Sequence, residues 1–157
     1  MTRYLIDTNI LVYLETPSSP FHNSVKERFQ QLYDEDQLYV SVLSLYELNY
    51  GAALKRKKGE EGFADLMLLT IEEIKKRFDL LTLNGVEART FGEIKAHYKE
   101  QYLKKEEKQT SIKKNDIDFL IASIAIEYDL VLASNDRIFE KIKELFTDLH
   151  VDNWAEI

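Results

Sequence analysis

Five short apolar runs, separated by longer segments in which apolar residues recur at helical spacing, most constrain the fold of this chain. Each run is continuous rather than alternating, which is typical of strands buried on both faces of a parallel sheet. The clearest helical stripe is formed by Ile117, Ile121, Ile124 and Tyr128. The alternation predicts an α/β protein of three layers, α/β/α, around a central, mostly parallel sheet of four to five strands. The expected strands are residues 4–6, 38–42, 80–83, 130–133 and 149–151.

Turn residues divide the helical segments without suggesting a domain boundary. Pro17 and Pro20 break the chain after a first short helix. Residues 57–60 separate two helices that we expect to form a hairpin. Residues 104–114 have little apolar content, so the second half of this segment is expected to be a mobile loop. A length of 157 residues suits one domain, and we expect residues 1–157 to form a single one.

The composition narrows the cellular setting. The hydrophobic fraction of 45% and the charged fraction of 31% are those of a soluble globular protein. Cysteine is absent, which excludes disulfides and thiolate metal sites and fits a reducing cytoplasm. The first residues lead directly into a strand without the apolar region of a signal peptide. The longest apolar stretch, residues 119–126, is too short to span a bilayer, so we expect a cytoplasmic protein without membrane association.

The charge balance argues against a protein that binds nucleic acid mainly through its net charge. The chain has 21 basic and 28 acidic residues, a net charge of −7. Two local basic runs, residues 55–58 and 104–114, could contact nucleic acid or could be solvated helix ends or loops. Several of the acids would also be neutralised if they bound metal. Charge alone therefore leaves the partner open.

Four acidic residues are placed where strands should give way to helices: Asp7, Glu47, Asp118 and Asp136. In an open α/β sheet, ligands bind beyond the carboxyl ends of the strands, so residues far apart in the sequence can meet there. Clustered carboxylates repel one another unless a divalent cation or a proton compensates their charge. Mg²⁺ and Mn²⁺ suit an all-oxygen site. The pattern favours a metal-dependent enzyme that acts on phosphodiesters.

Each acid also has a purely structural alternative. Asp7 and Asp136 could cap the N-termini of the helices that follow them. Glu47 stands three residues after Ser44, and Ser-x-x-Glu is a capping box. Asp118 lies in the first turn of its helix, where a carboxylate suits the helix dipole. The alternatives weaken together, because all four acids fall at one edge of the sheet, where helix N-termini would also favour phosphate.

A second aspartate precedes the third of these acids. Asp116 and Asp118 cannot both face one site from within a helix, because residues two apart point to nearly opposite sides. We favour Asp118 as the metal ligand and assign Asp116 a capping or supporting role. The histidines lack ligand spacing, and the glycines form no phosphate-binding loop. Tyr13, Tyr46 and Tyr50 could stack on bases, but we expect them to pack in the core.

The segments around the acids resemble the motifs of PIN-domain proteins, specifically the VapC-like toxins of bacterial and archaeal toxin–antitoxin pairs. The Asp-Thr-Asn of the first segment would be a weak signal alone, but four motifs in the right order over nearly the whole chain are specific. The four motifs and a similar C-terminal ending lie at residues 4–13, 41–52, 115–123, 132–136 and 151–154.

The resemblance implies roles for individual residues. It assigns metal binding and catalysis to Asp7, Glu47, Asp118 and Asp136. Asn9 and Ser134 match the polar residues that support these acids. The extra acid, Asp116, and the long charged segment at 104–114 depart from the expected pattern.

The resulting hypothesis is a Mg²⁺- or Mn²⁺-dependent endoribonuclease, the toxin of a toxin–antitoxin pair. Asp7 and Asp118 would hold one or two ions, and Glu47 and Asp136 would complete the cluster, with one of these two as general base. Water attack needs no 2′-hydroxyl, so the choice of RNA comes from the resemblance, as do a homodimer and a cognate antitoxin protein as partners. The rival hypotheses are a PIN nuclease of RNA processing or decay and a catalytically inert PIN-fold module that binds RNA or protein.

Overall fold

A five-stranded parallel sheet forms the centre of the computed structural model, which describes residues 1–103 and 114–156. The strand order is β3-β2-β1-β4-β5, and every neighbouring pair is parallel. Leu5 of β1 is in register with Tyr39 of β2 and Leu132 of β4. The strands are β1 (Arg3–Ile6), β2 (Gln37–Ser41), β3 (Asp79–Leu81), β4 (Val131–Ala133) and β5 (His150–Asp152). All five expected strands are confirmed, within one or two residues at each end.

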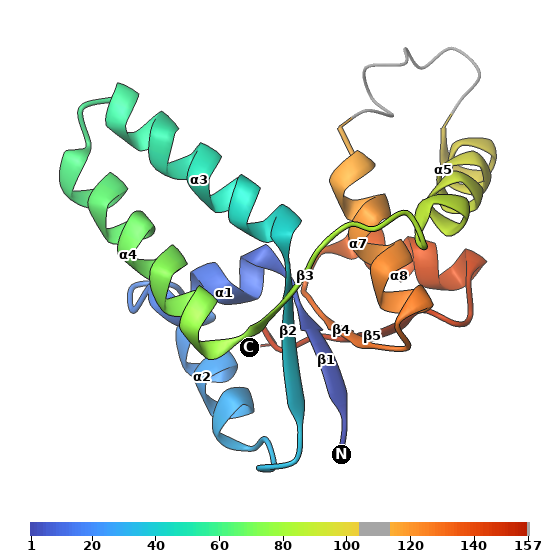
Figure 1. Cartoon of the computed structure of the whole chain (residues 1–157), viewed down its shortest axis with the longest axis horizontal. Helices are drawn as coiled ribbons and strands as arrows, with labels where there is room; N and C mark the ends of the chain where they lie inside the picture. The colour runs from blue at the N-terminus through green and yellow to red at the C-terminus, as the bar shows by residue number, and fades with distance from the viewer. Residues whose placement is uncertain (104–113, 157) are drawn as a thin grey trace.

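Helices cover both faces of the sheet, so the expected three layers are confirmed (Figure 1). One face is covered by α1 (Thr8–Glu15), α2 (His22–Gln30), α3 (Val42–Lys57) and α4 (Glu61–Arg77). The other is covered by α5 (Ala88–Tyr102), α7 (Asp116–Glu127) and α8 (Arg137–Leu145). Successive residues of β1 point to opposite faces of the sheet and belong to separate hydrophobic cores. Leu5 packs in the core with α5, α7 and α8, and Ile6 packs in the core with α1 to α4.

The helices α3 and α4 form the expected hairpin, which projects from the sheet (Figure 1). Gly59 turns the chain between them with φ of +78°, a conformation that favours glycine. The expected mobile loop at 104–114 lies almost entirely outside the described residues. Within residues 1–103 and 114–156, no helix is both long enough and apolar enough to cross a bilayer.

Candidate active site

Two of the four acids cap helices at the carboxyl edge of the sheet. Asp7 directly follows β1 and accepts a hydrogen bond from the backbone N–H of Thr8, at 2.8 Å. Asp136 follows β4 and accepts one from the N–H of Ile138, at 3.1 Å. The capping roles considered for both residues are confirmed, and each cap points its carboxylate out of the same sheet edge.

Glu47 is not part of a capping box, because α3 begins earlier than the sequence pattern suggested. Ser41 is the N-cap of α3, and its hydroxyl accepts a hydrogen bond from the N–H of Leu43 at 3.2 Å. Glu47 therefore lies in the second turn. Its Oε2 instead accepts a hydrogen bond from the Thr8 hydroxyl of α1, at 2.5 Å.

The structure brings the four acids together in one pocket. Asp118, in the first turn of α7, shares a hollow of about 350 Å³ with the other three. Thr8, Asn9, Val12 and Tyr13 of α1 complete its lining. The four carboxylates thus reach one pocket from four separate segments, as the positions of the acids predicted.

Ser134 links three residues of this pocket. Its buried hydroxyl donates to Asp7 Oδ2 at 2.7 Å and accepts from the backbone N–H of Asp136 at 3.1 Å. The side-chain amide of Asn9 approaches the same hydroxyl at 3.4 Å and donates to Asn135 Oδ1 at 2.8 Å. Asn9 and Ser134, the expected polar support, are therefore both in contact with the acid cluster or its neighbours.

The electrostatics of the pocket raise the pKa of two of its carboxyls, Asp7 and Asp118. Burial raises the pKa of Asp7 to about 6, against the lowering effect of its hydrogen bonds from Ser134 and Thr8. Burial also raises the pKa of Asp118 to about 7, and the negative charges of Asp136, Asp7 and Glu47 raise it further. The negative charges of Glu47 and Asp136 therefore act on both Asp7 and Asp118.

Compensating cations are absent from the described surroundings of the cluster. Within residues 1–103 and 114–156, no Lys, Arg or His nitrogen forms an ion pair with any of the four acids. The Oδ1 atom of Asn9 is buried and accepts no hydrogen bond from this part of the chain. The donor set of carboxylate and amide oxygens fits Mg²⁺ or Mn²⁺. Among the described side chains, however, no three acidic or imidazole groups are already gathered tightly enough to hold an ion, so binding would require the carboxylates to move closer.

Asp116 lies away from this pocket. Its Oδ1 is 2.8 Å from the Nζ atom of Lys95 on α5. Asn115, and not Asp116, is the residue that precedes α7 at the N-cap position. The geometry agrees with the choice of Asp118 over Asp116 as the residue that faces the site, and it gives Asp116 an ion pair between two helices.

Two of the three tyrosines near the acids are exposed, so the expectation that they pack in the core was wrong for them. Tyr46 and Tyr50 are 63% and 67% exposed, because α3 buries the opposite face, which carries Leu45, Leu48 and Ala52. Tyr13 does pack, with its ring centroid 4.8 Å from that of Phe21.

The basic run at 55–58 is partly neutralised within the hairpin. Lys55 pairs with Glu60, and Arg56 pairs with both Glu61 and Asp65. These contacts favour the structural alternative for the first half of the run.

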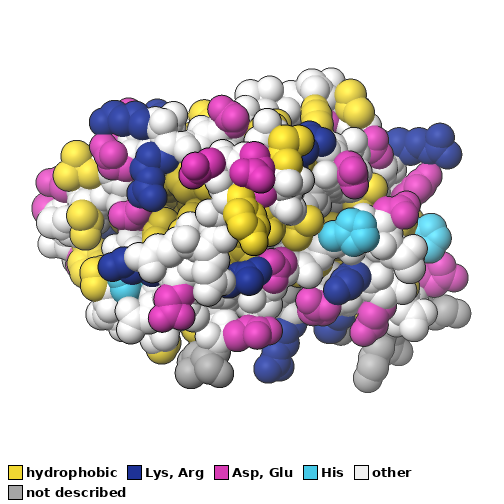
Figure 2. Space-filling view, turned by 90° about the horizontal axis from the view of Figure 1, so that it is seen from below, with side chains coloured by type: hydrophobic (Ala, Val, Ile, Leu, Met, Phe, Trp, Pro, Cys, Tyr) yellow, Lys and Arg dark blue, Asp and Glu magenta, His cyan; other side chains and the backbone are white. Residues whose placement is uncertain are grey.

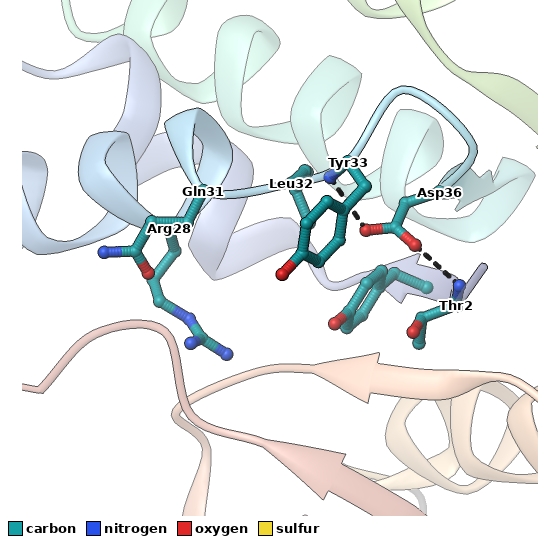
Figure 3. A pocket seen from close by; sticks show the side chains of 7 residues that line it. Thr2, Arg28, Gln31, Leu32, Tyr33 and Asp36 are labelled. Atoms are coloured by element: carbon teal, nitrogen blue, oxygen red, sulfur yellow. Dashed lines mark hydrogen bonds between the residues drawn. The ribbon is translucent and has the colours of Figure 1, made fainter.

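A second hollow, of about 460 Å³, lies at the amino ends of the strands (Figure 3). It has a single carboxylate, Asp36, which already accepts hydrogen bonds from the backbone N–H groups of Thr2 and Tyr33, at 2.6 and 3.0 Å. Size alone therefore does not mark the functional site. The smaller acidic pocket has the reactive groups.

Sequence reasoning missed the side chain of Thr8. Its contact with Glu47 joins residues 39 positions apart, and neither residue's neighbours indicate the other. The only available signal was a hydroxyl residue directly after the first acid.

With this geometry in place, the chain can be compared with known proteins. The model of the PIN domain family matches residues 4–145. The chain therefore belongs to the PIN domain family.

Individual relatives agree over nearly the whole length. The chain is 31% identical over 156 residues to a protein named Ribonuclease VapC2 from Haemophilus influenzae, covering 99% of this chain and 100% of that protein. It also resembles VapBC2 from Rickettsia felis, solved bound to a DNA fragment from its promoter, with a TM-score of 0.72, 22% identity and coverage of 98% and 99%. VapBC-5 from Mycobacterium tuberculosis, a member of the VapBC family of toxin–antitoxin systems, aligns with a TM-score of 0.67, 15% identity and the same coverage.

Proposed function

We propose that this PIN-domain protein is a Mg²⁺- or Mn²⁺-dependent endoribonuclease and the toxin of a toxin–antitoxin pair, acting in the cytoplasm. The observation that carries the proposal is the single pocket reached by Asp7, Glu47, Asp118 and Asp136, with no described cation to neutralise them. The relative named as a ribonuclease, similar over nearly its entire length, supports the choice of RNA.

Asp7 and Asp118 would hold the metal, and Glu47 and Asp136 would complete the cluster directly or through water. When bound, the ion would offset negative charge at the phosphate and make a nearby water more acidic. Its charge would also oppose the burial and the mutual repulsion that raise the pKa values of Asp7 and Asp118. The buried Oδ1 of Asn9 adds a free oxygen beside the acids.

The remaining chemistry belongs to the chain itself. Glu47 or Asp136 would accept the proton of the attacking water as general base. Glu47 is held by the Thr8 hydroxyl, whereas Asp136 is exposed and held as a helix cap. Ser134 would keep Asp7 oriented toward the pocket through its hydrogen bond to Oδ2.

Contacts with RNA would be largely uncharged. A chain with a net charge of −7 gains little from bulk attraction to phosphate. Tyr46 directly precedes Glu47 on α3, and Tyr50 lies about one helical turn after Glu47. Both tyrosine side chains are exposed. Aromatic rings at this position would suit stacking with unpaired bases.

We also propose that the antitoxin covers an apolar groove beside the acids. A hollow of about 310 Å³ between α1, α3 and α4 is lined by Val12, Leu48, Phe63, Leu66 and Met67, among others. Val12 lines the acidic pocket as well, so a protein seated in the groove would lie against the active site. The relatives solved as toxin–antitoxin assemblies support such a partner, and a homodimer is part of the same proposal.

The test is cleavage of a structured RNA pool by purified, antitoxin-free protein with Mn²⁺, compared with EDTA and with Asp7→Asn. We expect cutting that disappears in both controls. Cutting that survives Asp7→Asn would indicate a contaminating nuclease, and absence of cutting by the wild type would favour an inert binding module. Growth arrest on expression, relieved by the neighbouring antitoxin gene, would separate a toxin from a nuclease of RNA processing.

A further inference from the structure

Thr8 contacts two acids of the pocket through two different donors. Its backbone N–H donates to Asp7 Oδ1 at 2.8 Å, and its hydroxyl donates to Glu47 Oε2 at 2.5 Å. Asp7 follows β1, whereas Glu47 belongs to α3. One residue of α1 therefore joins acids from two separate elements.

The hydroxyl of Thr8 is not needed to build its helix. Asp7 already supplies the N-terminal cap of α1. Thr8 is the first helical residue, where a β-branched side chain is tolerated whether or not it has a hydroxyl. The hydrogen bond to Glu47 is thus a feature that the local fold does not require.

Glu47, by contrast, depends on this contact for a fixed orientation. Its side chain has three rotatable bonds and is only half-buried. In the described part of the chain, the Thr8 hydroxyl is the one hydrogen-bond donor to its carboxylate, and no cation pairs with it. Without the Thr8 hydroxyl, the Glu47 side chain would populate several rotamers, and its carboxylate would have no fixed position.

We propose that Thr8 is a positioning residue that holds the Glu47 carboxylate in the acidic pocket by occupying Oε2 and leaving Oε1 free of protein donors. Oε1 is then the atom available to a metal ion or to the attacking water. This inference rests on the proposed function, since it assigns Thr8 a part in that reaction. It goes beyond the function by stating which atom of Glu47 does the chemistry and what fixes it there.

The test compares Thr8→Val, which keeps the shape and removes the donor, with Thr8→Ser, which keeps the donor. Thr90→Val is the matched control, because the Thr90 hydroxyl donates to Glu127 in the same manner but between α5 and α7, away from the acids. Kinetics of RNA cleavage give kcat and KM separately. The Mn²⁺ concentration that gives half of the thermal stabilisation is measured in parallel, without substrate.

We expect Thr8→Val to lower kcat about 10- to 100-fold with little change in KM, and to weaken the Mn²⁺ response, as loss of an orienting partner does in metal sites. Thr8→Ser should recover most of both values, and Thr90→Val should stay within about twofold of wild type. Melting in EDTA checks that each variant folds. In a Glu47→Gln background, Thr8→Val should cause almost no further loss, because the two residues act as one unit.

Three results would overturn the inference while leaving the nuclease intact: wild-type behaviour of Thr8→Val, equal damage from Thr8→Ser, or full additivity with Glu47→Gln. A wild-type protein that neither cleaves RNA nor gains stability from Mn²⁺ would overturn the proposed function and the role of Thr8 together.

Discussion

Asp36 and Asp7 lie at opposite ends of β1 and show how the two edges of the sheet differ. Asp36 is bound to the N–H of Thr2, just before the strand, and that hydrogen bond, with a second from Tyr33, lowers its pKa. Asp7 directly follows the strand and also accepts two hydrogen bonds, yet burial raises its pKa to about 6. Hydrogen-bond donors have the largest effect on the pKa of Asp36, and burial has the largest effect on the pKa of Asp7.

The surroundings of the two edges repeat this difference. Seen from below Figure 1, the side of the N-terminus, Lys and Arg side chains are interspersed with Asp and Glu (Figure 2). At the carboxyl edge, four acids share one pocket without a described cation. At the amino edge, backbone N–H groups of the chain hold the Asp36 carboxylate, whereas the acids at the carboxyl edge lack a described cation and could be neutralised by a ligand. Matched substitutions at the two edges test this contrast.

The largest expected effect is on catalysis. Asp118→Asn should lower the rate of RNA cleavage by at least about 10²-fold, because a metal ligand contributes several kcal/mol to the transition state. Asp36→Asn should leave the rate within about twofold of wild type, since Asp36 has no part in the pocket. Single-turnover cleavage with Mn²⁺ measures both. Equal loss in the two variants would mean that the edges do not differ in function.

The next effect is stabilisation by metal. Mn²⁺ at about 100 times its Kd should stabilise the wild type by about 2.7 kcal/mol, a rise in Tm of about 5–10 °C. Asp36→Asn should respond in the same way, and Asp118→Asn should respond weakly or not at all. Thermal melting with Mn²⁺ or EDTA makes the measurement, and a response retained by Asp118→Asn would remove that residue from the proposed ligands.

The third effect concerns the stability of the metal-free protein. Asp118→Asn, which should lower activity, should raise this stability. The folded pKa of Asp118, about 7, exceeds its ordinary value of 3.8, so the unfolded chain binds fewer protons between these values. Stability should therefore fall as pH rises through this window. Asp118→Asn should stabilise the metal-free protein at pH 7.5 by about 1–2 kcal/mol, allowing for partial solvent exposure, and by almost nothing near pH 4. Urea unfolding in EDTA at the two pH values decides the sign.

The sequence predicted the fold and the gathering of the four acids because both depend on local pattern and topology. Continuous apolar runs identify buried parallel strands, and residues after parallel strands meet at one edge. The positions of Asp7 and Asp136 at this edge could be predicted from these two rules alone. Their capping roles were also predictable, since Asp directly before a helix is a common cap.

Details that depend on contacts between distant segments were not predictable. The Ser44-x-x-Glu47 pattern suggested a capping box, but Ser41 starts the helix three residues earlier. The bond from Thr8 to Glu47 and the ion pair of Asp116 with Lys95 each require the packed structure. Tyr46 and Tyr50 are exposed because of the direction in which α3 buries its apolar face, which composition does not reveal.

The smallest effect comes from Asp36 and should have the opposite pH dependence to that of Asp118. Its folded pKa is lowered, so its contribution is present above the unfolded value of 3.8 and is lost as pH falls through the folded pKa. Asp36→Asn should lower Tm slightly at pH 7, and the difference from wild type should shrink below pH 3.8 as the wild-type carboxyl takes up a proton. Melting curves in EDTA between pH 3 and 7 provide the measurement. A rise in Tm at pH 7, as expected for Asp118→Asn, would show that hydrogen bonds from Thr2 and Tyr33 do not outweigh the cost of the charge, and the contrast between the two edges of the sheet would then rest on the acidic pocket alone.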